Sequence, residues 1–381
     1  MNATGIYLDW NADAPVSEHA WQAYVEASQH FGNPSSAHGP GRAARAVLEN
    51  ARTAVGHAFG MPADSVIFTS GGTESDALAL LGFLEEAKQG SVVVAGIEHP
   101  AVIKNLEELC ERNGLQLIHA EVGASGIIDV DQVESAMSSD TLLVSVMMAS
   151  NETGIIQPIQ EIAAICRARG VVMHTDAVQA VGRMPVSMPE LGVHMMTISG
   201  HKFGALSGTG ALLVEDGIVL KPQLTGGGQE QGLRGGTENV AGAACMAAAL
   251  EMLPSQQVLD TCEQKRERFE AAILKSCADV VVLGAEQPRL VNTSCIRFKG
   301  CPGDAILMAL DIEGIFVSTG SACSSGSVLP SPALLAMGID EEAARECVRF
   351  SFPPELEDVE FETALEKVIT VVERMRTFGK L

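Results

Sequence analysis

Short apolar runs alternate with stretches of helical spacing through the first two thirds of the chain. The runs are continuously apolar, a pattern typical of strands that are buried on both faces of a sheet. They occupy residues 65–69, 92–95, 142–148, 171–176 and 210–214. Between them, apolar residues recur at helical spacing over residues 47–58, 74–88 and 160–169. This alternation predicts an α/β domain with a mostly parallel sheet and helices on both faces.

The pattern changes after Gly242. A long helical stretch, residues 241–277, is interrupted at Pro254 and is charged in its second half. We expect this stretch to lead into a second, smaller α/β domain. The apolar segment at residues 6–10 fits either part by its pattern. We place the large domain at residues 16–249 and the small domain at residues 250–381 together with residues 1–15.

Composition and charge narrow the function classes. Of the 381 residues, 46% are hydrophobic, as in a globular chain, and the net charge of −23 argues against nucleic acid or an anionic membrane as the main partner. No apolar run is long enough to cross a bilayer, and no signal-peptide pattern opens the chain. The nine cysteines form no C-x-x-C pair, which favours free thiols in a reducing, cytoplasmic compartment. Cys295 and Cys301 lack neighbouring ligand side chains, so no metal site is predicted.

Two polar residues follow or end buried strands, where ligands bind in open α/β sheets. Lys202 stands in "SGHKFG", and Asp176 ends the run "VVMHTD". Lys202 is either an ordinary exposed lysine or an amine that forms a Schiff base, which requires partial desolvation. Asp176 is either a helix N-cap or the partner of a buried cationic heterocycle. We expect His174 to lie on the other face of the same strand and to pack or hydrogen-bond there.

A turn with two glycines joins the first of these strands to its helix. Its sequence "TSGGTES", residues 69–75, matches neither the P-loop nor the dinucleotide-binding pattern. Backbone N–H groups at such a helix start bind phosphate, and Thr73 could also cap the helix. A Schiff-base lysine, a strand-end aspartate and a phosphate-binding turn together are what pyridoxal phosphate (PLP) requires, because the aspartate keeps the ring nitrogen protonated.

A cysteine stands in the small-residue segment "STGSACSSG", residues 318–326. The Gly and Ser residues around Cys323 give such a segment freedom to move. A reactive thiolate needs partial exposure. The segment is therefore either a surface loop with an incidental cysteine, or an arm whose nucleophile can carry a group away from the site.

The chain resembles the PLP-dependent cysteine desulfurases with a short active-site cysteine loop, within the class V aminotransferase superfamily. The resemblance covers nearly the whole chain, in the order "IYLDW", "FGNPSSAHGPGRAAR", "VIFTSGGTESDALA", "EHPAV", "SNETGIIQPI", "HTDAVQAVGRMPV", "SGHKF", "RGGTENV", "STGSACSSGSVLPSPALLAMG" and "VRFSF". It implies fold type I of the PLP-dependent transferases, with a mostly parallel seven-stranded sheet, helices on both faces and a smaller α/β C-terminal domain. It also implies removal of sulfur from L-cysteine, which gives L-alanine and a persulfide on Cys323.

The resemblance implies a role toward the cofactor for each matching residue. Lys202 would form the Schiff base and move the Cα proton, and His99 would stack on the ring and handle protons. Asp176 would pair with the ring nitrogen, and Gln179 would hydrogen-bond the phenolic oxygen. The phosphate would be held by Gly72, Thr73, Ser199, His201 and, from the neighbouring subunit of a homodimer, Thr237.

The resemblance also implies which residues bind the substrate and which partner receives the sulfur. Asn151 and Arg349 would orient L-cysteine, with the Arg349 guanidinium gripping its carboxylate as a two-pronged fork. The Cys323 thiolate would attack the substrate sulfur. The persulfide would then pass to an acceptor protein of unknown identity, for iron–sulfur cluster, metallocofactor or thio-compound synthesis. Neither nucleic acid nor a membrane is expected as a partner.

Some segments depart from the family pattern. Residues 203–210, "FGALSGTG", lack the usual proline and basic residue, and "GGGQE" at residues 226–230 replaces a run that commonly contains histidine. Pro353 and Pro354 stand where a Gly-Arg pair is frequent. These departures leave the local loop geometry and the acceptor surface open.

Two other function classes are weighed against this one. One is a different PLP enzyme of the same fold, an aminotransferase or a selenocysteine lyase. The other is a non-enzymatic binding protein that kept the fold. An aminotransferase would have no use for Cys323, and a binding protein would show loss of Lys202, Asp176 or Cys323, all of which are present.

Overall fold

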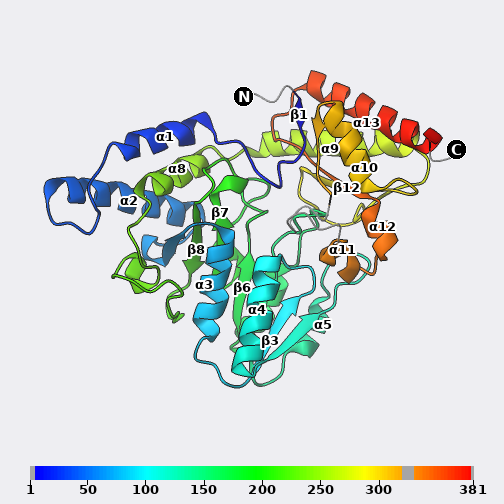
Figure 1. Ribbon diagram of the computed structural model, residues 1–381. Coiled ribbons are helices and arrows are strands. Elements are labelled where there is room, and N and C mark those ends of the chain that lie inside the picture. The colour runs from blue at the N-terminus through cyan, green and yellow to red at the C-terminus, as the bar shows by residue number, and fades with distance from the viewer. Residues whose placement is uncertain (1–4, 320–329, 379–381) are drawn as a thin grey trace.

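The centre of the computed structural model is a seven-stranded sheet (Figure 1). The structure describes residues 5–319 and 330–378. In sheet order the strands are β2 (Val66–Thr69), β8 (Gly210–Val214), β7 (Met195–Ser199), β6 (Val172–Asp176), β5 (Thr141–Ser145), β3 (Ser91–Ala95) and β4 (Gln116–Ala120). Strand β8 runs antiparallel to both of its neighbours, and the other pairs are parallel. The predicted mostly parallel seven-stranded sheet is confirmed.

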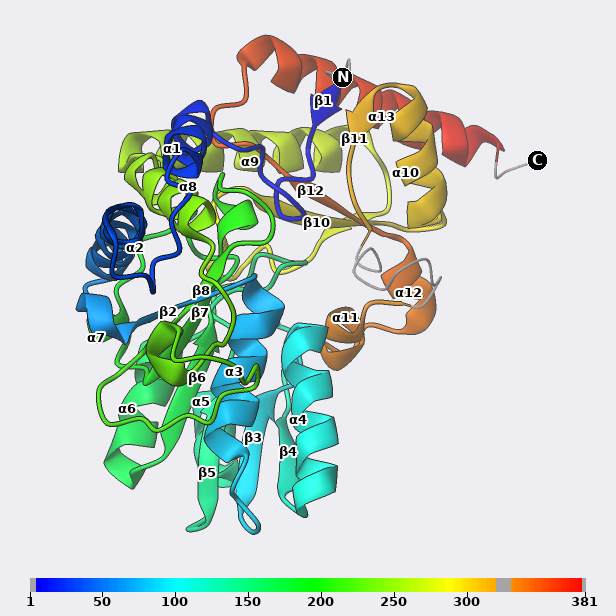
Figure 2. The same ribbon diagram turned by 60° about the vertical axis from the view of Figure 1, so that its left-hand side comes forward.

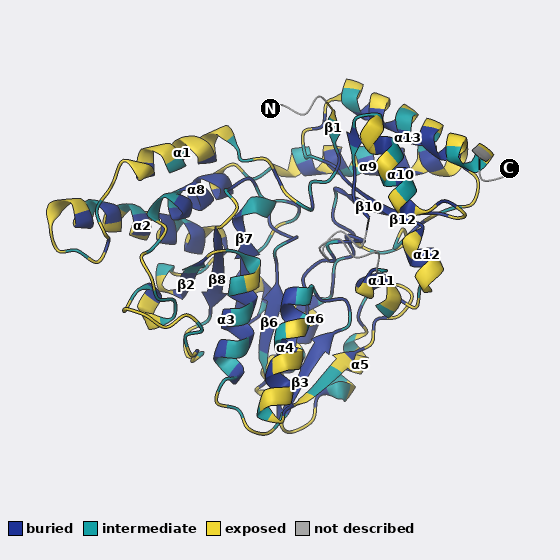
Figure 3. Ribbon diagram, in the orientation of Figure 1, coloured by how far each residue is buried: buried dark blue, intermediate teal, exposed yellow. Residues whose placement is uncertain are grey.

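Helices cover both faces of this sheet. They include α3 (Gly72–Leu84), α4 (Pro100–Asn113), α5 (Val130–Ala136) and α6 (Ile159–Arg169). Figure 2 shows α3 and α4 on one face and α6 on the other. Alternate residues of β3 face opposite sides of the sheet. Val92 and Val94 pack with the helices α3 and α4, whereas Val93 packs on the α6 side. Both faces of the strands are therefore buried (Figure 3), which explains their continuous apolar runs.

Further helices extend the large part of the molecule. They are α1 (Glu18–Ser28), α2 (Gly39–Ala58), α7 (Met188–Leu191) and α8 (Val240–Glu251), with the 3-10 helices η1 (Ala63–Ser65), η2 (Gly200–Lys202) and η3 (Glu230–Gly232). Helix α8 packs against both α1 and α2. Half of its buried residues are alanine, and these small side chains let the helices approach closely.

A second core lies in the C-terminal part. Its elements are β1 (Ile6–Tyr7), α9 (Gln256–Ser276), β9 (Val280–Val282), β10 (Thr293–Phe298), α10 (Gly303–Ile312), β11 (Ile315–Phe316), α11 (Pro332–Ala336), α12 (Glu341–Arg345), β12 (Cys347–Ser351) and α13 (Asp358–Phe378). Strands β12, β10 and β9 form an antiparallel sheet, and β1 pairs in parallel with β11. The ring of Phe269 packs against Phe350, Phe352 and Phe361 at centroid distances of 5.0, 5.2 and 6.4 Å. The N-terminal segment therefore joins this part of the molecule.

Some boundaries differ from the sequence prediction. The interruption at Pro254 separates α8 from α9 as predicted. Strand β5 ends at Ser145, three residues early, and α3 begins at Gly72 and ends at Leu84. The sequence did not reveal β4 or β7, and β4 has no uninterrupted apolar run because it lies at the sheet edge with partly exposed residues. The division into domains at residues 16–249 and 250–381 stays a prediction.

The cysteines of the described ranges are all buried, free thiols: Cys110, Cys166, Cys245, Cys262, Cys277, Cys295, Cys301 and Cys347. Burial raises the pKa of Cys166 and of Cys262 to about 12, so both thiols stay protonated at neutral pH. Cys323 lies outside the described residues. Over residues 5–319 and 330–378, no helix combines the length and the apolar character needed to cross a bilayer.

Candidate active site

A cavity of about 360 Å³ lies where the strands β6 and β7 end. Ten of the residues predicted for the site line it: Gly72, Thr73, His99, Asn151, Asp176, Gln179, Ser199, His201, Lys202 and Arg349. The sequence did not identify six other lining residues, which are Asn11, Ala12, Asp76, Met147, Ala149 and Val178. The topology thus brings residues from both cores to one cavity at the carboxyl ends of parallel strands.

Lys202 ends the 3-10 helix η2, which directly follows β7. Its side chain is half-buried, and its Nζ donates to the backbone carbonyl oxygens of Asn11 at 2.9 Å and Ala12 at 2.6 Å. An amine held at the wall of a cavity by two carbonyl groups differs from a solvated surface lysine. It can react there once it loses its proton.

Asp176 is buried at the end of β6. Its Oδ1 accepts a hydrogen bond from the Val178 N–H at 2.8 Å, within a turn rather than at the start of a helix. Burial raises the pKa of Asp176 to about 6, although this hydrogen bond and the nearby Lys202 lower it. Because the charge of this carboxylate is poorly solvated, binding a cationic group would stabilise it.

Two more carboxyl groups are buried beside Asp176. Burial and the charge of Asp176 raise the pKa of Asp76 and of Glu98 well above the usual range. Close, desolvated carboxyl groups resist ionising together. Asp176, which is hydrogen-bonded by a backbone N–H and lies near Lys202, is the one whose anion is best supported.

His174 lies on the same face of β6 as Asp176, so the expectation of the opposite face is wrong. Side chains two residues apart in a strand point the same way. The His174 Nε2 lies 3.0 Å from the Thr197 hydroxyl and 3.5 Å from Asp76 Oδ1, and its Nδ1 lies 2.9 Å from the Ser145 hydroxyl. Burial lowers the pKa of His174 to about 3, so the ring is a neutral link in this network.

The helix α3 presents its N-terminus to the cavity. Its N-cap residue is Gly71, which has no side chain to cap the helix, so Thr73 is not the cap. Gly72 and Thr73 line the cavity in the first turn, where N–H groups have no partner within the helix. The hydroxyl of Ser199 lies 2.9 Å from Nδ1 of His201 nearby. This arrangement suits the binding of an anion such as phosphate.

Two histidine rings stay neutral at the cavity. His99 caps α4, and its Nδ1 accepts a hydrogen bond from the Ala101 N–H at 3.1 Å, so a neutral ring carries its proton on Nε2. Burial and then the charge of Lys202 lower the pKa of His99. Burial, Lys202 and Arg183 lower the pKa of His201 to about 4. Both rings therefore offer hydrogen bonds without a charge.

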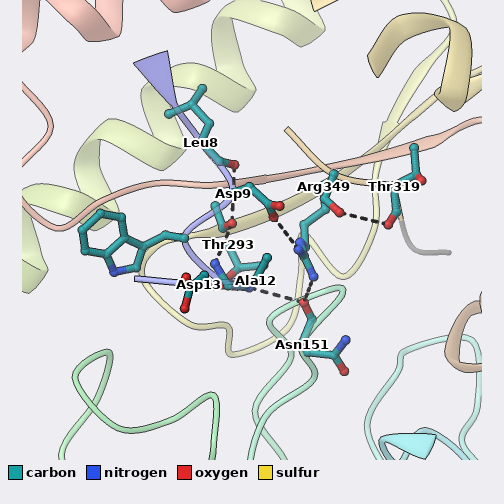
Figure 4. A network of polar contacts seen from close by, with 12 residues as sticks. Leu8, Asp9, Ala12, Asp13, Asn151, Thr293, Thr319 and Arg349 are labelled. Carbon is teal, nitrogen blue, oxygen red and sulfur yellow. Dashed lines mark hydrogen bonds and ion pairs between the residues drawn. The ribbon is translucent and has the colours of Figure 1, made fainter. Parts of the chain in front are cut away.

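Arg349 reaches the cavity from β12, in the C-terminal part. Its guanidinium is buried and donates from Nη2 to the Asp9 carboxylate at 2.5 Å and from Nη1 to the Asn151 carbonyl oxygen at 2.8 Å (Figure 4). Asn11 connects the surroundings of Arg349 to Lys202 and Gln179 through hydrogen bonds. Its carbonyl oxygen also accepts from Gln179 Nε2 at 3.0 Å, and its Nδ2 donates to the Thr293 hydroxyl at 2.9 Å.

Two residues predicted for the site are not among those that line this cavity. Thr237 is exposed in the segment between η3 and α8. Its assignment to the site of a neighbouring subunit stays a prediction. Cys323 lies outside the described residues. The roles of Asp9 and Asn11 were missed, although the polar Asp9 inside the apolar run "IYLDW" was a signal that could have led to them.

A family model described as aminotransferase class-V matches residues 6–361. The chain belongs to the aminotransferase class-V family. Among curated members, "Cysteine desulfurase IscS" from Dictyoglomus turgidum (strain DSM 6724 / Z-1310) is 38% identical over 98% of this chain and 96% of that protein.

Solved structures of class-V family relatives agree with the fold. A NifS-like protein superposes with a TM-score of 0.90 at 29% identity, over 97% of this chain and all of that one. "SspA in complex with cysteine" superposes with a TM-score of 0.83 at 30% identity, over 92% of this chain and 100% of that chain. The relatives are thus similar along nearly their whole lengths.

Proposed function

We propose that the cavity is the place where a PLP-dependent cysteine desulfurase holds its cofactor and L-cysteine. The chain is such an enzyme, which removes sulfur from L-cysteine. The observation that carries the assignment is the convergence of three features on one cavity: the amine of Lys202, the buried carboxylate of Asp176 and the uncapped N-terminus of α3. Each matches one functional group of PLP, namely the aldehyde, the ring nitrogen and the phosphate.

The residues present fit the cofactor. Asp176 is a buried carboxylate whose Oδ1 accepts a hydrogen bond from a backbone N–H, and a protonated ring nitrogen would supply a cationic donor. The Oε1 of Gln179 is buried without a hydrogen bond, at the same cavity. Gly72 leaves room beside Ser199, where a Cβ would approach Val178 to 3.1 Å. The cavity therefore combines polar lining groups with a volume of about 360 Å³.

PLP, when bound, would withdraw electrons from the Cα of the substrate, so that bonds at Cα and Cβ break heterolytically. The residues of this chain would control the protons. Lys202 Nζ would bind the cofactor and, once released, would take the Cα proton. His99, neutral and protonated on Nε2, would donate a hydrogen bond and pass a proton. Asp176 would hold the proton of the ring nitrogen.

Arg349 and Asn151 would place L-cysteine, because both line the cavity and the guanidinium can bind a carboxylate through two N–H groups. The Cys323 thiolate would attack the substrate sulfur. A new S–S bond forms, the S–Cβ bond breaks with its electron pair moving to carbon, and a proton on that carbon completes L-alanine. Cys323 is left as a persulfide.

Partners and compartment belong to the same proposal. We propose a homodimer in which Thr237 of the partner subunit completes the phosphate site, and an acceptor protein that takes the sulfur for iron–sulfur cluster, metallocofactor or thio-compound synthesis. The exposure of Thr237 supports its availability to another subunit. The free, buried thiols of the described residues support a reducing compartment such as the cytoplasm.

The test is incubation of the PLP-loaded protein with L-cysteine, followed by separate measurement of L-alanine and of persulfide on Cys323. We expect both products from the wild type. Lys202→Ala should lose the visible absorption band of the bound cofactor and slow alanine formation by about 100-fold or more. Lys221→Ala is the matched control, because that lysine is exposed and pairs with Glu86.

Cys323→Ser separates the function from its alternatives. A desulfurase should lose the persulfide and release alanine at least about 100-fold more slowly, because the sulfur has no acceptor. An aminotransferase would retain its activity in this variant. Alanine formation from L-cysteine that continues unchanged without Cys323 would therefore contradict the proposed function.

A further inference from the structure

The Arg349 guanidinium already holds a carboxylate that belongs to the chain itself. Asp9 Oδ1 lies 2.5 Å from Nη2, and the second terminal nitrogen donates to the Asn151 carbonyl oxygen (Figure 4). The Nε is buried and has no hydrogen-bond partner, so that edge of the guanidinium is closed to a ligand. An incoming carboxylate can take two N–H groups only at the terminal nitrogens, where Asp9 stands.

The side chain of Arg349 is more deeply buried than that of Asp9. Arg349 is held in β12, which pairs with β10, and its backbone exchanges hydrogen bonds with Ser318 at 2.7 and 3.2 Å. Its side chain is 3% exposed, whereas that of Asp9 is 19% exposed. Of the two side chains, that of Asp9 therefore lies nearer to water.

The same short segment also occupies the amine of Lys202. The carbonyl oxygens of Asn11 and Ala12 accept from its Nζ at 2.9 and 2.6 Å. Residues 9–12 thus supply hydrogen-bond acceptors to both cationic side chains that line the cavity. A buried cation left without an acceptor would be costly, so the contact with Asp9 stabilises the Arg349 guanidinium.

We propose that Asp9 is an internal stand-in for the substrate carboxylate, which L-cysteine must displace from Arg349. This inference rests on the proposed function, in which Arg349 binds that carboxylate. The exchange conserves charge at the guanidinium, since one carboxylate leaves as another arrives. Asp9 thereby sets the affinity for amino acids. A ligand without a carboxylate does not displace Asp9 and makes no contact with Arg349.

The test is a titration of the PLP-loaded protein with L-alanine, the sulfur-free product, followed through the visible spectrum of the cofactor. Ethylamine, which has the amine but no carboxylate, is the second probe. We expect Asp9→Asn to lower the Kd for L-alanine about tenfold, because the competing charge is gone, and to leave the Kd for ethylamine unchanged. L-alanine should also raise the unfolding temperature of Asp9→Asn more than that of the wild type.

Asp13→Asn is the matched control. It removes the same charge from the same segment. Asp13 is exposed, whereas the carboxylate that contacts Arg349 belongs to Asp9. An equal gain in affinity from Asp13→Asn would overturn the proposal, because the effect would then be general electrostatics. A Kd for L-alanine that stays the same or rises in Asp9→Asn would overturn it as well. If Asp9→Asn does not fold, Asp9→Ser is subject to the same criteria.

Arg349→Ala distinguishes failure of this inference from failure of the proposed function. Weaker L-alanine binding in Arg349→Ala, with no gain in Asp9→Asn, would leave the carboxylate site intact and remove only the role of Asp9. Unchanged L-alanine binding in Arg349→Ala would remove the assignment of Arg349, and the role of Asp9 with it.

Discussion

Asp176 links the chemistry of the site to the pH dependence of stability. Burial raises its pKa to about 6 in the folded protein, above the ordinary value of 3.8. The folded state therefore binds this proton more tightly than the unfolded state. The tighter binding of this proton stabilises the folded state fully below about pH 4. This stabilisation is lost as the pH rises through 6, since the buried carboxyl must then ionise.

Asp176→Asn should therefore stabilise the cofactor-free protein at pH 7.5 by about 2–3 kcal/mol, because the amide has no charge to desolvate. The difference should shrink as the pH falls toward 4, where the carboxyl of the folded wild type is protonated and that of the unfolded chain is becoming so. Urea unfolding of the cofactor-free proteins at both pH values measures it. Asp216→Asn, at an exposed position, should show no such trend. A wild type that is the more stable protein at pH 7.5 would contradict the prediction.

At the scale of elements, the start of β8 lies against the turn that we propose to bind phosphate. Gly210 pairs with Thr69 of β2 and with Ser199 of β7. A Cβ on Gly210 would meet the backbone N, Cα and C of Gly71 at 2.6–2.8 Å. Those atoms are backbone and cannot swing aside, so the N-terminus of α3 would have to move.

Gly210→Ala should consequently weaken PLP binding by about tenfold or more and lower the free energy of unfolding by about 1–3 kcal/mol. Equilibrium titration of the cofactor-free protein with PLP, together with urea unfolding, measures both effects. Gly123→Ala is a suitable control, because nothing lies within 4 Å of a Cβ built there. Unchanged PLP affinity in Gly210→Ala would show that the turn tolerates displacement.

The elements also show how far the sequence alone can lead. The apolar runs predicted the strands β2, β3, β5, β6 and β8, because covering both faces of a parallel sheet demands apolar residues throughout. The signal is absent at the edge strand β4, which was missed, and the buried strand β7 was missed as well. Asp176, which ends β6, and Lys202, which follows β7, were placed at the cavity because topology brings strand ends together. Asp9 and Asn11 were not identified from the sequence, because the pairing of β1 with β11 is a tertiary contact with no local pattern.

At the scale of the whole molecule, the predicted homodimer can be tested through Thr237. The homodimer of Lys202→Ala should be inactive. The homodimer of Thr237→Ala should bind PLP more weakly, because the phosphate loses a hydrogen bond. A mixed dimer contains one subunit of each variant. One of its two sites would then combine an intact Lys202 with an intact Thr237 of the other subunit, and the second site would lack both. Co-expression should therefore restore about a quarter of the wild-type rate at limiting PLP, if subunits pair at random.

The outcome separates action within a subunit from action between subunits. If Thr237 served its own subunit, every site in a mixed dimer would carry one of the two defects. Co-expression would then yield no more activity than the separately purified variants. A monomeric wild type in sedimentation experiments would also contradict the predicted homodimer.

The contact between Asp9 and Arg349 has a consequence for biosynthesis. The two residues lie 340 positions apart. A ribosome that adds about 5–20 residues per second needs roughly 20–70 seconds to pass from one to the other. Strand β6 with Asp176 and the 3-10 helix η2 with Lys202 are made well before β12. A nascent chain would therefore contain these residues, which we propose to hold the cofactor, while it still lacks Arg349. If these roles are as proposed, translation would separate the time at which PLP can first be bound from the time at which L-cysteine can first be held.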